Sequence, residues 1–217
     1  MQNETPQVNT RLKDLLLPAY GPCPAFDSVC SDMRWSPAEG HVPRGFSGAT
    51  GELREVELVL VCAEPGDPHT GERHDAGTTE EWYLRSTSSY SYKCLREGTD
   101  LFHRNIRLIL KLCWPELEIG PQLRKTWITD SVLCSAKTEG GKVSGAIEQE
   151  CRRRYLERQL AAMPWALVVA LGGKAYERLK GIPGVLKAIS AAPPGCNYRQ
   201  ARPSWEQVAR TVRSRTT

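Results

Sequence analysis

The sequence predicts an α/β protein with three layers, in which helices cover both faces of a central four-stranded parallel sheet. The chain has 217 residues, enough to bury the core of a single domain spanning 1–217. Four short runs rich in Val, Ile or Leu lack alternation of apolar and polar residues, which is typical of strands buried on both faces. Helical patterns lie between these runs, and strands that alternate with helices favour a parallel sheet.

The expected elements follow one another along the chain. Residues 11–17 form a short helix, and the rest of 1–50 is an irregular segment rich in Pro, Gly, Cys and Ser. Strands are expected at 55–63, 126–133, 166–171 and 185–191. Further helices are expected at 100–114, 148–163, 174–180 and 203–213. Gly181 and Pro183 end the third of these helices, and Pro203 suits the first turn of the last.

The composition excludes several classes of protein. Hydrophobic residues make up 40% and charged residues 25% of the chain, which excludes a disordered chain, a fibre and a coiled coil. The polar start lacks the apolar core of a secretory signal. The apolar stretches at 56–63 and 161–173 are shorter than the roughly 20 residues of a membrane span. We therefore expect a cytoplasmic protein that does not enter a membrane.

The net charge of +4 is concentrated at the end of the chain. Residues 199–217 hold five arginines and a single acidic residue, Glu206, so the other residues sum to zero. A basic end can attract a polyanion such as nucleic acid, although a solvated helix face has the same composition.

Eight cysteines in a cytoplasmic chain indicate metal binding or catalysis, because disulfides are rare in a reducing compartment. One pair is separated by six residues and another by 16, and four thiolates could bind zinc or an iron–sulfur cluster. Two of these cysteines lie in the irregular segment 1–50. A loop this long within a compact domain requires interactions that fix its conformation. The candidate ligands are Cys23, Cys30, Cys134 and Cys151. We expect Cys62, Cys94 and Cys113 to be small buried hydrophobes.

A carboxylate follows the first expected strand, in the sequence AEPGDP at 63–68. Ligands of open α/β sheets bind at the carboxyl ends of the strands. Glu64 is therefore expected on a rigid turn that faces this crevice, where it could orient or deprotonate a water molecule. An ordinary acidic residue in a Pro-Gly turn is the alternative.

Four further motifs follow AEPGDP along the chain. They are TWITDSVLC at 126–134, CRRRYLERQL at 151–160, PWALVVALGGKAYERL at 164–179 and PPGCNYRQARPSWEQV at 193–208. Taken together, the five motifs resemble the uracil-DNA glycosylase superfamily, and most closely its iron–sulfur-containing bacterial and archaeal branch. The last motif is similar to the ending of the single-strand-selective glycosylases. The resemblance extends from about Cys23 to Trp205.

The resemblance implies a monofunctional DNA glycosylase. Such an enzyme flips a nucleotide out of the DNA stack and hydrolyses its N-glycosidic bond, leaving an abasic site without a catalytic lysine. In this chain the resemblance implies Glu64 as the water-orienting base. It implies the four candidate cysteines as ligands of a 4Fe–4S cluster that pins the N-terminal segment, with structural zinc as the alternative. DNA is the implied partner, and the superfamily implies a monomer.

The sequence also offers candidates for contact with the base and the DNA. Residues 172–174 open a helix after a strand, where backbone N–H groups can hold a phosphate, although a tight strand–helix turn has the same sequence. Residues 193–199 form the loop expected to enter the duplex or support the flipped base, and the arginines there would meet phosphates. The base-binding candidates are Asp130, Gly66, Asp67 and Asn197. The DNA-binding candidates are Gly172, Gly173, Lys174, Pro194, Gly195, Arg199 and Arg202.

Three positions depart from the superfamily pattern. Glu64 lies directly before Pro-Gly, whereas the acidic residue of the iron–sulfur branch comes one position earlier. Asp130 replaces a base-reading Asn; when ionised it only accepts hydrogen bonds, which suits the exocyclic amine of cytosine better than the O4 of uracil. A turn cap is the alternative role for Asp130. Ala192 stands where a His stabilises the leaving base, and His69 is either its substitute or an ordinary surface residue.

These departures favour a base other than uracil. Our hypothesis is a modified cytosine, hydroxymethylated or glucosylated as in phage genomes, which would give the enzyme a role in phage defence. The alternatives are uracil excision in DNA repair, a catalytically weak relative that binds DNA, and an unrelated α/β protein with structural zinc. Aromatic residues within 78–92 could stack on the base or belong to the core. They are Trp82, Tyr83, Tyr90 and Tyr92.

Overall fold

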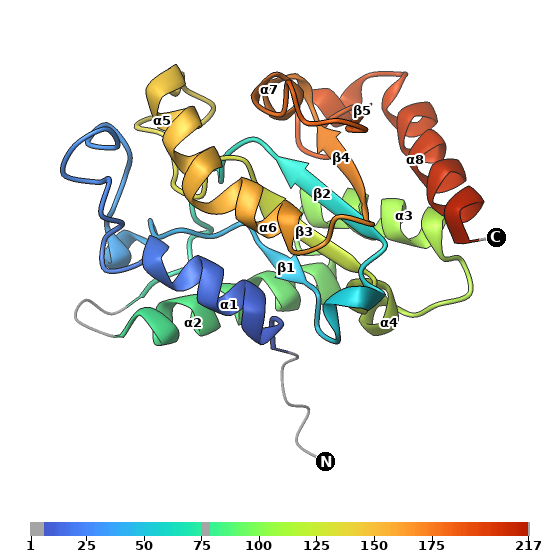
Figure 1. The fold of residues 1–217 in the computed structure, drawn as a ribbon, viewed down its shortest axis with the longest axis horizontal. Helices are drawn as coiled ribbons and strands as arrows, with labels where there is room; N and C mark the ends of the chain where they lie inside the picture. Colours follow the sequence, from blue (N-terminus) through green and yellow to red (C-terminus); the bar gives the residue numbers. More distant parts are fainter. Residues whose placement is uncertain (1–6, 75–78, 217) are drawn as a thin grey trace, which may run out of the picture.

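The computed structural model describes residues 7–74 and 79–216 and confirms the α/β class. Its described part contains one five-stranded sheet with the order β1-β3-β2-β4-β5 (Figure 1). Strands β2 to β5 are parallel to one another, whereas β1 runs antiparallel to β3. The strands are β1 Ser47–Gly48, β2 Leu58–Cys62, β3 Thr126–Asp130, β4 Leu167–Leu171 and β5 Leu186–Ala188.

The expectation of a purely parallel four-stranded sheet is wrong, because an antiparallel edge strand is added. The four parallel strands lie within the ranges expected from the sequence, but β1 comes from the segment expected to be irregular. Two residues are too short to show a strand pattern. Gly48 has φ +95°, and a Cβ there would lie 2.0 Å from the Thr126 carbonyl oxygen. Glycine therefore permits the close approach that pairs β1 with β3.

The helices differ from the expectation in three places. The helix expected at 148–163 is interrupted by a π turn at Arg152–Leu156, directly after Cys151. The 18-residue helix α2 was not expected, because its Ser- and Thr-rich sequence has no clear apolar stripe. The helices are α1 Thr10–Leu16, α2 Glu80–Glu97, α3 Leu101–Cys113, α4 Ile119–Arg124, α5 Gly145–Cys151, α6 Glu157–Ala161, α7 Gly173–Arg178 and α8 Ala201–Thr216.

Caps explain why α2 forms without an apolar stripe. The Thr79 side chain accepts a hydrogen bond from the backbone N–H of Trp82, and Gly98 ends the helix in the left-handed conformation. Two acidic residues in the first turn, Glu80 and Glu81, are favourable at the positive end of the helix dipole. The short helix α4 was also not expected, since Gly120 and Pro121 lie within it.

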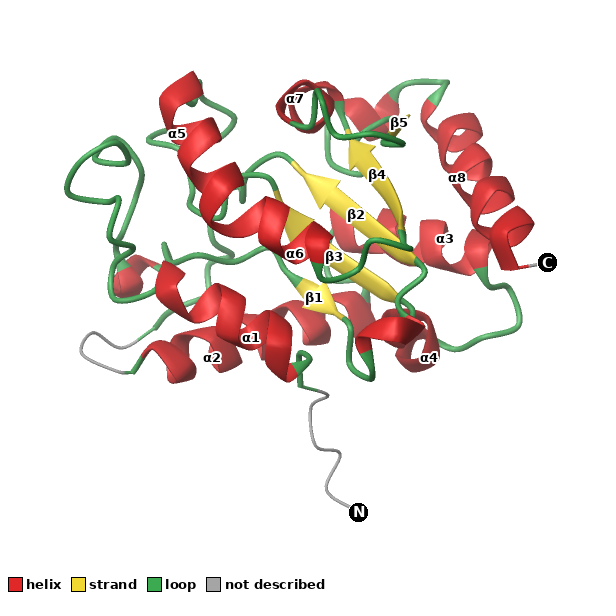
Figure 2. Cartoon of the chain, in the orientation of Figure 1, coloured by secondary structure: helices red, strands yellow, loops and turns green. Residues whose placement is uncertain are grey.

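Helices pack against both faces of the sheet (Figure 2). Val59 and Val61 of β2 point into a core shared with α1 and the segment α5–α6. Leu58 and Leu60 point into a second core shared with α3 and α8. The irregular N-terminal segment belongs to the first of these cores, where Phe46 is fully buried. In the described ranges, no helix combines the length and the apolar character that crossing a membrane requires.

Candidate active site at the carboxyl edge of the sheet

Glu64 lies two residues after β2, at the edge where all four parallel strands end. Its side chain is only 6% exposed, and both carboxylate oxygens are paired with cations. Oε1 accepts a hydrogen bond from Lys174 Nζ at 2.8 Å, and Oε2 accepts one from Arg178 Nη1 at 2.5 Å. A buried carboxylate needs such partners, because desolvation otherwise disfavours its charge. The candidate base is therefore held in one orientation at the strand ends.

Asp130, the last residue of β3, is 4% exposed and has a glycine directly beside it. Gly45 has φ +89°, and a Cβ at that position would lie 1.8 Å from Asp130 Oδ2. Within the described residues no hydrogen bond or ion pair reaches the Asp130 carboxyl group, so it does not cap a turn there. Burial raises the pKa of this carboxyl well above its usual value; the charge of Glu64 adds to the shift, while Arg44 and Arg178 oppose it.

The raised pKa changes the hydrogen bonds that Asp130 can make. The sequence suggested an ionised carboxylate that only accepts hydrogen bonds, but burial favours the protonated carboxyl, which both donates and accepts. In that form the group can donate to one polar atom of a ligand and accept a hydrogen bond from another.

Replacing Asp130 by Asn should remove a pH-dependent loss of stability. The folded state keeps a proton that the unfolded chain releases near pH 4, so stability falls by about 1.4 kcal/mol for each pH unit between the unfolded- and folded-state pKa values. Asn does not titrate. The unfolding free energy of D130N minus that of the wild type should therefore rise as the pH increases above about 4, where the carboxyl of the unfolded chain loses its proton. Denaturant unfolding measures this difference, and a value independent of pH would contradict the prediction.

The N-terminal segment holds the loop that follows Glu64. Arg34 Nη1 pairs with Asp67 Oδ1 at 2.8 Å. The Gly66 carbonyl oxygen accepts hydrogen bonds from Arg44 Nη2 and from Ser135 Oγ, the latter at 3.2 Å. Arg44 is 7% exposed. Neither arginine was expected from the sequence, because each lies more than 20 residues from the loop it contacts.

His69 is not joined to Glu64 by any contact within the described residues. Its Nδ1 lies 3.0 Å from the Tyr90 hydroxyl on α2, and its Nε2 lies 3.1 Å from Asp100 Oδ2 at the start of α3. Asp100 also binds His103 Nδ1 at 2.6 Å. Both ring nitrogens of His69 are therefore engaged between the loop and these two helices. The structure supports the alternative of a partly exposed surface histidine.

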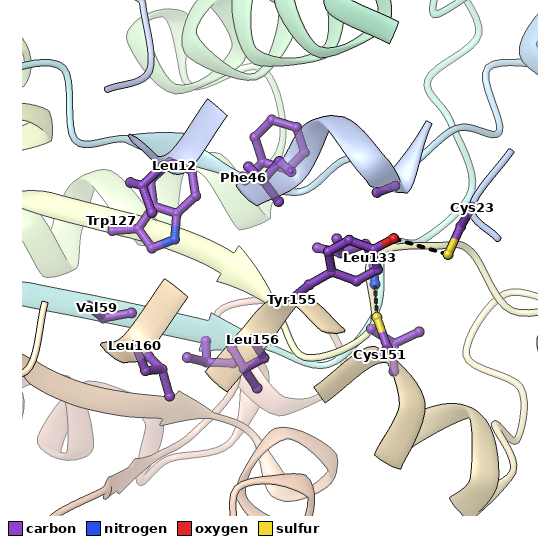
Figure 3. Close-up of a cluster of buried hydrophobic side chains, with 14 of the residues drawn as sticks. Leu12, Cys23, Phe46, Val59, Trp127, Leu133, Cys151, Tyr155, Leu156 and Leu160 are labelled. Atoms are coloured by element: carbon purple, nitrogen blue, oxygen red, sulfur yellow. Dashed lines mark hydrogen bonds between the residues drawn. The ribbon is translucent and has the colours of Figure 1, made fainter. Parts of the chain in front are cut away.

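The four candidate cysteines line one cavity, although they come from three separate parts of the sequence. Figure 3 shows Cys23 and Cys151 near Tyr155, whose hydroxyl lies 3.0 Å from Cys23 Sγ. Cys151 Sγ accepts a hydrogen bond from the backbone N–H of Leu133 at 3.4 Å. Burial raises the pKa of the Cys151 thiol to about 12. The pKa of Cys134 is raised by burial and by the other three cysteines. The structure thus brings all four together.

The donors of this cavity suit an iron–sulfur cluster. Thiolates are the ligands that such clusters require, and backbone N–H groups that point at sulfur are typical of their surroundings. A bound cation would replace the thiol protons that burial now favours. In residues 7–74 and 79–216, no group of three or more His, Cys, Asp or Glu is arranged to hold a metal ion.

Cysteines outside the cavity have the surroundings expected of small hydrophobes. Cys94 and Cys113 are 2% and 1% exposed, and Cys62 packs partly buried against the second core.

Three of the DNA-binding candidates line a surface groove of about 690 Å³, counting the part open to solvent. They are Gly172, Gly173 and Gly195, and the exposed ring of Tyr198 lies at the same groove. Gly172 has φ +101°, and its N–H donates to the Ala188 carbonyl at 2.8 Å. These contacts support the tight strand–helix turn, which the sequence left as the alternative to a phosphate site.

The other candidates of the last motif differ in their surroundings. Lys174 does not line the groove. Its ammonium group also donates to the carbonyl oxygens of Gly140 and Gly141, at 2.9 Å each. Arg202 pairs with Glu206 within α8. Pro194 and Asn197 flank or lie in a short turn at Gly195–Asn197, and Arg199 is exposed just after it.

The aromatic residues of α2 fall into two groups. Tyr83 is 4% exposed and stacks on Tyr20, so it belongs to the core. Trp82 is 38% exposed, and Tyr90 contacts His69. Thr78, the first residue of the region considered for base stacking, lies outside the described residues.

The sequence matches no protein-family model and no curated protein.

Proposed function

We propose that this chain is a monofunctional DNA glycosylase that hydrolyses the N-glycosidic bond of a flipped base and leaves an abasic site. The observation that carries the proposal is the gathering of Glu64, Asp130 and the groove at 172–173 and 195 at the carboxyl edge of one sheet. Open α/β sheets bind ligands at this edge. Four of the five motifs that resemble the superfamily thus have residues at this edge.

Glu64 orients the attacking water in this proposal. As the bond between the sugar C1′ and the base nitrogen breaks, the sugar gains oxocarbenium character and the base leaves with the bonding electrons. Water attacks C1′, and its proton passes to the Glu64 carboxylate. Lys174 and Arg178 hold that carboxylate in place at 2.8 and 2.5 Å. No lysine needs to form a covalent intermediate.

Asp130 reads the Watson–Crick edge of the base. A carboxyl group that accepts from the exocyclic amine favours cytosine, so a hydroxymethylated or glucosylated cytosine remains the preferred substrate, with phage defence as the role. Uracil is the second candidate, because the raised pKa of Asp130 provides a donor for O4.

The domain has three layers in this proposal, and its N-terminal segment is pinned by a 4Fe–4S cluster on Cys23, Cys30, Cys134 and Cys151, with zinc as the alternative. When bound, the cluster supplies a structural cross-link. The segment that it fixes carries Arg34 and Arg44, which contact Asp67 and Gly66 beside Glu64. The protein acts as a cytoplasmic monomer on DNA.

Labelled oligonucleotides that each contain one altered base test the proposal, with alkali to cleave abasic sites. The panel holds uracil, hydroxymethyluracil, hypoxanthine, hydroxymethylcytosine and glucosylated hydroxymethylcytosine. We expect cleavage at a modified cytosine. Cleavage at uracil alone would keep the glycosylase and overturn the preference assigned to Asp130. DNA binding without any cleavage would favour the catalytically weak relative. If the protein neither binds nor cleaves any of the oligonucleotides, the proposal is wrong.

A further inference from the structure

Arg178, which the sequence did not single out, is a buried guanidinium at the end of α7. Its side chain is 4% exposed. A guanidinium stays charged even when buried, so it needs acceptors that match its planar fork of N–H groups. The described contacts supply three such acceptors, from three different elements of the fold.

These acceptors connect the candidate base to its surroundings. Arg178 Nη1 donates to Glu64 Oε2 at 2.5 Å and to Ser131 Oγ at 3.1 Å. Ser131 Oγ in turn donates to the carbonyl oxygen of Ala63 at 2.6 Å, one residue before Glu64. Arg178 Nε donates to Glu148 Oε1 on α5 at 2.7 Å. The guanidinium therefore fixes the Glu64 carboxylate directly and its backbone through Ser131.

Lys174 contacts the same carboxylate but cannot fix it in the same way. Its side chain is 46% exposed, and its ammonium group is shared with the carbonyls of Gly140 and Gly141. An ammonium group is a flexible point charge without a preferred plane, whereas a guanidinium imposes direction on its partners. The orientation of Glu64 thus depends chiefly on Arg178.

We infer that Arg178 is the positioning residue of the reaction: it holds the Glu64 carboxylate in the orientation that directs water at the sugar carbon. The inference rests on the proposed function, since it assigns a role within that site. Arg178 does not touch the substrate in this view. Its contribution is to the turnover number and not to DNA binding, because both Glu64 and the guanidinium are buried.

Two variants and a rescue by guanidinium ion test this role with the oligonucleotide that the wild type cleaves. Arg178→Met should lower kcat by about 100-fold, the loss expected for a displacement of about 1 Å, and leave KM within about threefold. Arg178→Lys keeps the charge and should recover part of the loss. Low concentrations of guanidinium ion should restore activity to R178M by about tenfold or more, since a free guanidinium can occupy the vacated space.

Arg152→Met is the matched control. Arg152 Nη1 donates to the carbonyls of Arg178 and Lys180 at 3.1 and 2.8 Å, so it holds the end of α7, but no described contact joins it to Glu64. R152M should keep kcat. If R152M and R178M lose activity equally and guanidinium restores neither, α7 has a merely structural role and the inference is wrong. If R178M does not fold, R178K still tests the inference. A kcat of R178K equal to that of the wild type, with no effect of added guanidinium ion, would also overturn the role assigned to Arg178.

The wild type tests the proposed function, and the variants test the role of Arg178. Cleavage by the wild type and by R178M at equal rates would overturn only the role of Arg178. A wild type that cleaves none of the oligonucleotides would overturn the proposed function and this role together.

Discussion

Replacing Glu64 by Gln should lower the turnover number on the cleaved oligonucleotide by about 10²- to 10⁴-fold. The amide keeps the shape of the carboxylate and its oxygen can still accept a hydrogen bond from Arg178, but it cannot take up the proton of the attacking water. DNA affinity should change little, because the Glu64 side chain is 6% exposed. Single-turnover cleavage and a parallel binding titration measure the two effects.

Glu148→Gln is the matched control for this variant. Glu148 accepts a hydrogen bond from the same guanidinium at 2.7 Å, but it lies on α5 and is separate from the candidate base. Breaking a buried ion pair can cost about 3–5 kcal/mol of stability, so the unfolding of both variants has to be followed. Equal losses of turnover in E64Q and E148Q would assign Glu64 a structural role and contradict the prediction.

The second large effect is expected at the cysteine cavity. Replacing Cys151 by Ser should lower the unfolding free energy by more than about 3 kcal/mol and abolish the visible absorbance of an iron–sulfur cluster. A buried hydroxyl without a partner costs about 1–3 kcal/mol by itself, and the loss of a metal ligand adds to it because metal binding and folding are coupled. Denaturant unfolding and the absorption spectrum of the anaerobically purified protein measure the change.

Cys113→Ser serves as its control, because Cys113 is 1% exposed and lies in the other core, away from the cavity. This variant should lose only the smaller amount and keep the absorbance. The wild type should contain about four iron atoms per chain. Stoichiometric zinc would contradict the cluster, and equal destabilisation of both variants without any bound metal would contradict a metal site at the cavity.

The parallel strands could be predicted because each is marked by the apolar character of its own consecutive residues. Residues 58–62 and 167–171 are continuously apolar, and burial on both faces requires this of a central parallel strand. The candidate metal ligands were selected by chemistry and resemblance together, and the structure brings them around one cavity. Helix α2 could not be predicted from apolar periodicity, because the residues that indicate it are its caps, Thr79 and Gly98.

The rest of the candidate site depends on contacts between distant residues. Arg178 lies 114 residues from Glu64 in the sequence, and no local sequence pattern around either residue predicts that the two form an ion pair. The protonation of Asp130 depends on its burial beside Gly45, which the sequence of β3 alone does not contain. The sequence left His69 as either a substitute for the His missing at Ala192 or a surface residue, and its contacts with α2 and with Asp100 at the start of α3 could not be read from it.

The π turn at Arg152–Leu156 links the number of residues in this segment to the direction of Cys151. Each residue of an α-helix advances the chain by about 100° around the axis, whereas a residue of a π turn advances it by less. The turn therefore accommodates one extra residue while Cys151 lines the cavity and Leu156 and Leu160 stay buried. Winding the same five residues as a regular α-helix would turn Cys151 away from these two leucines. Alignments of this protein should therefore expect a relative without the π turn to be one residue shorter in this segment.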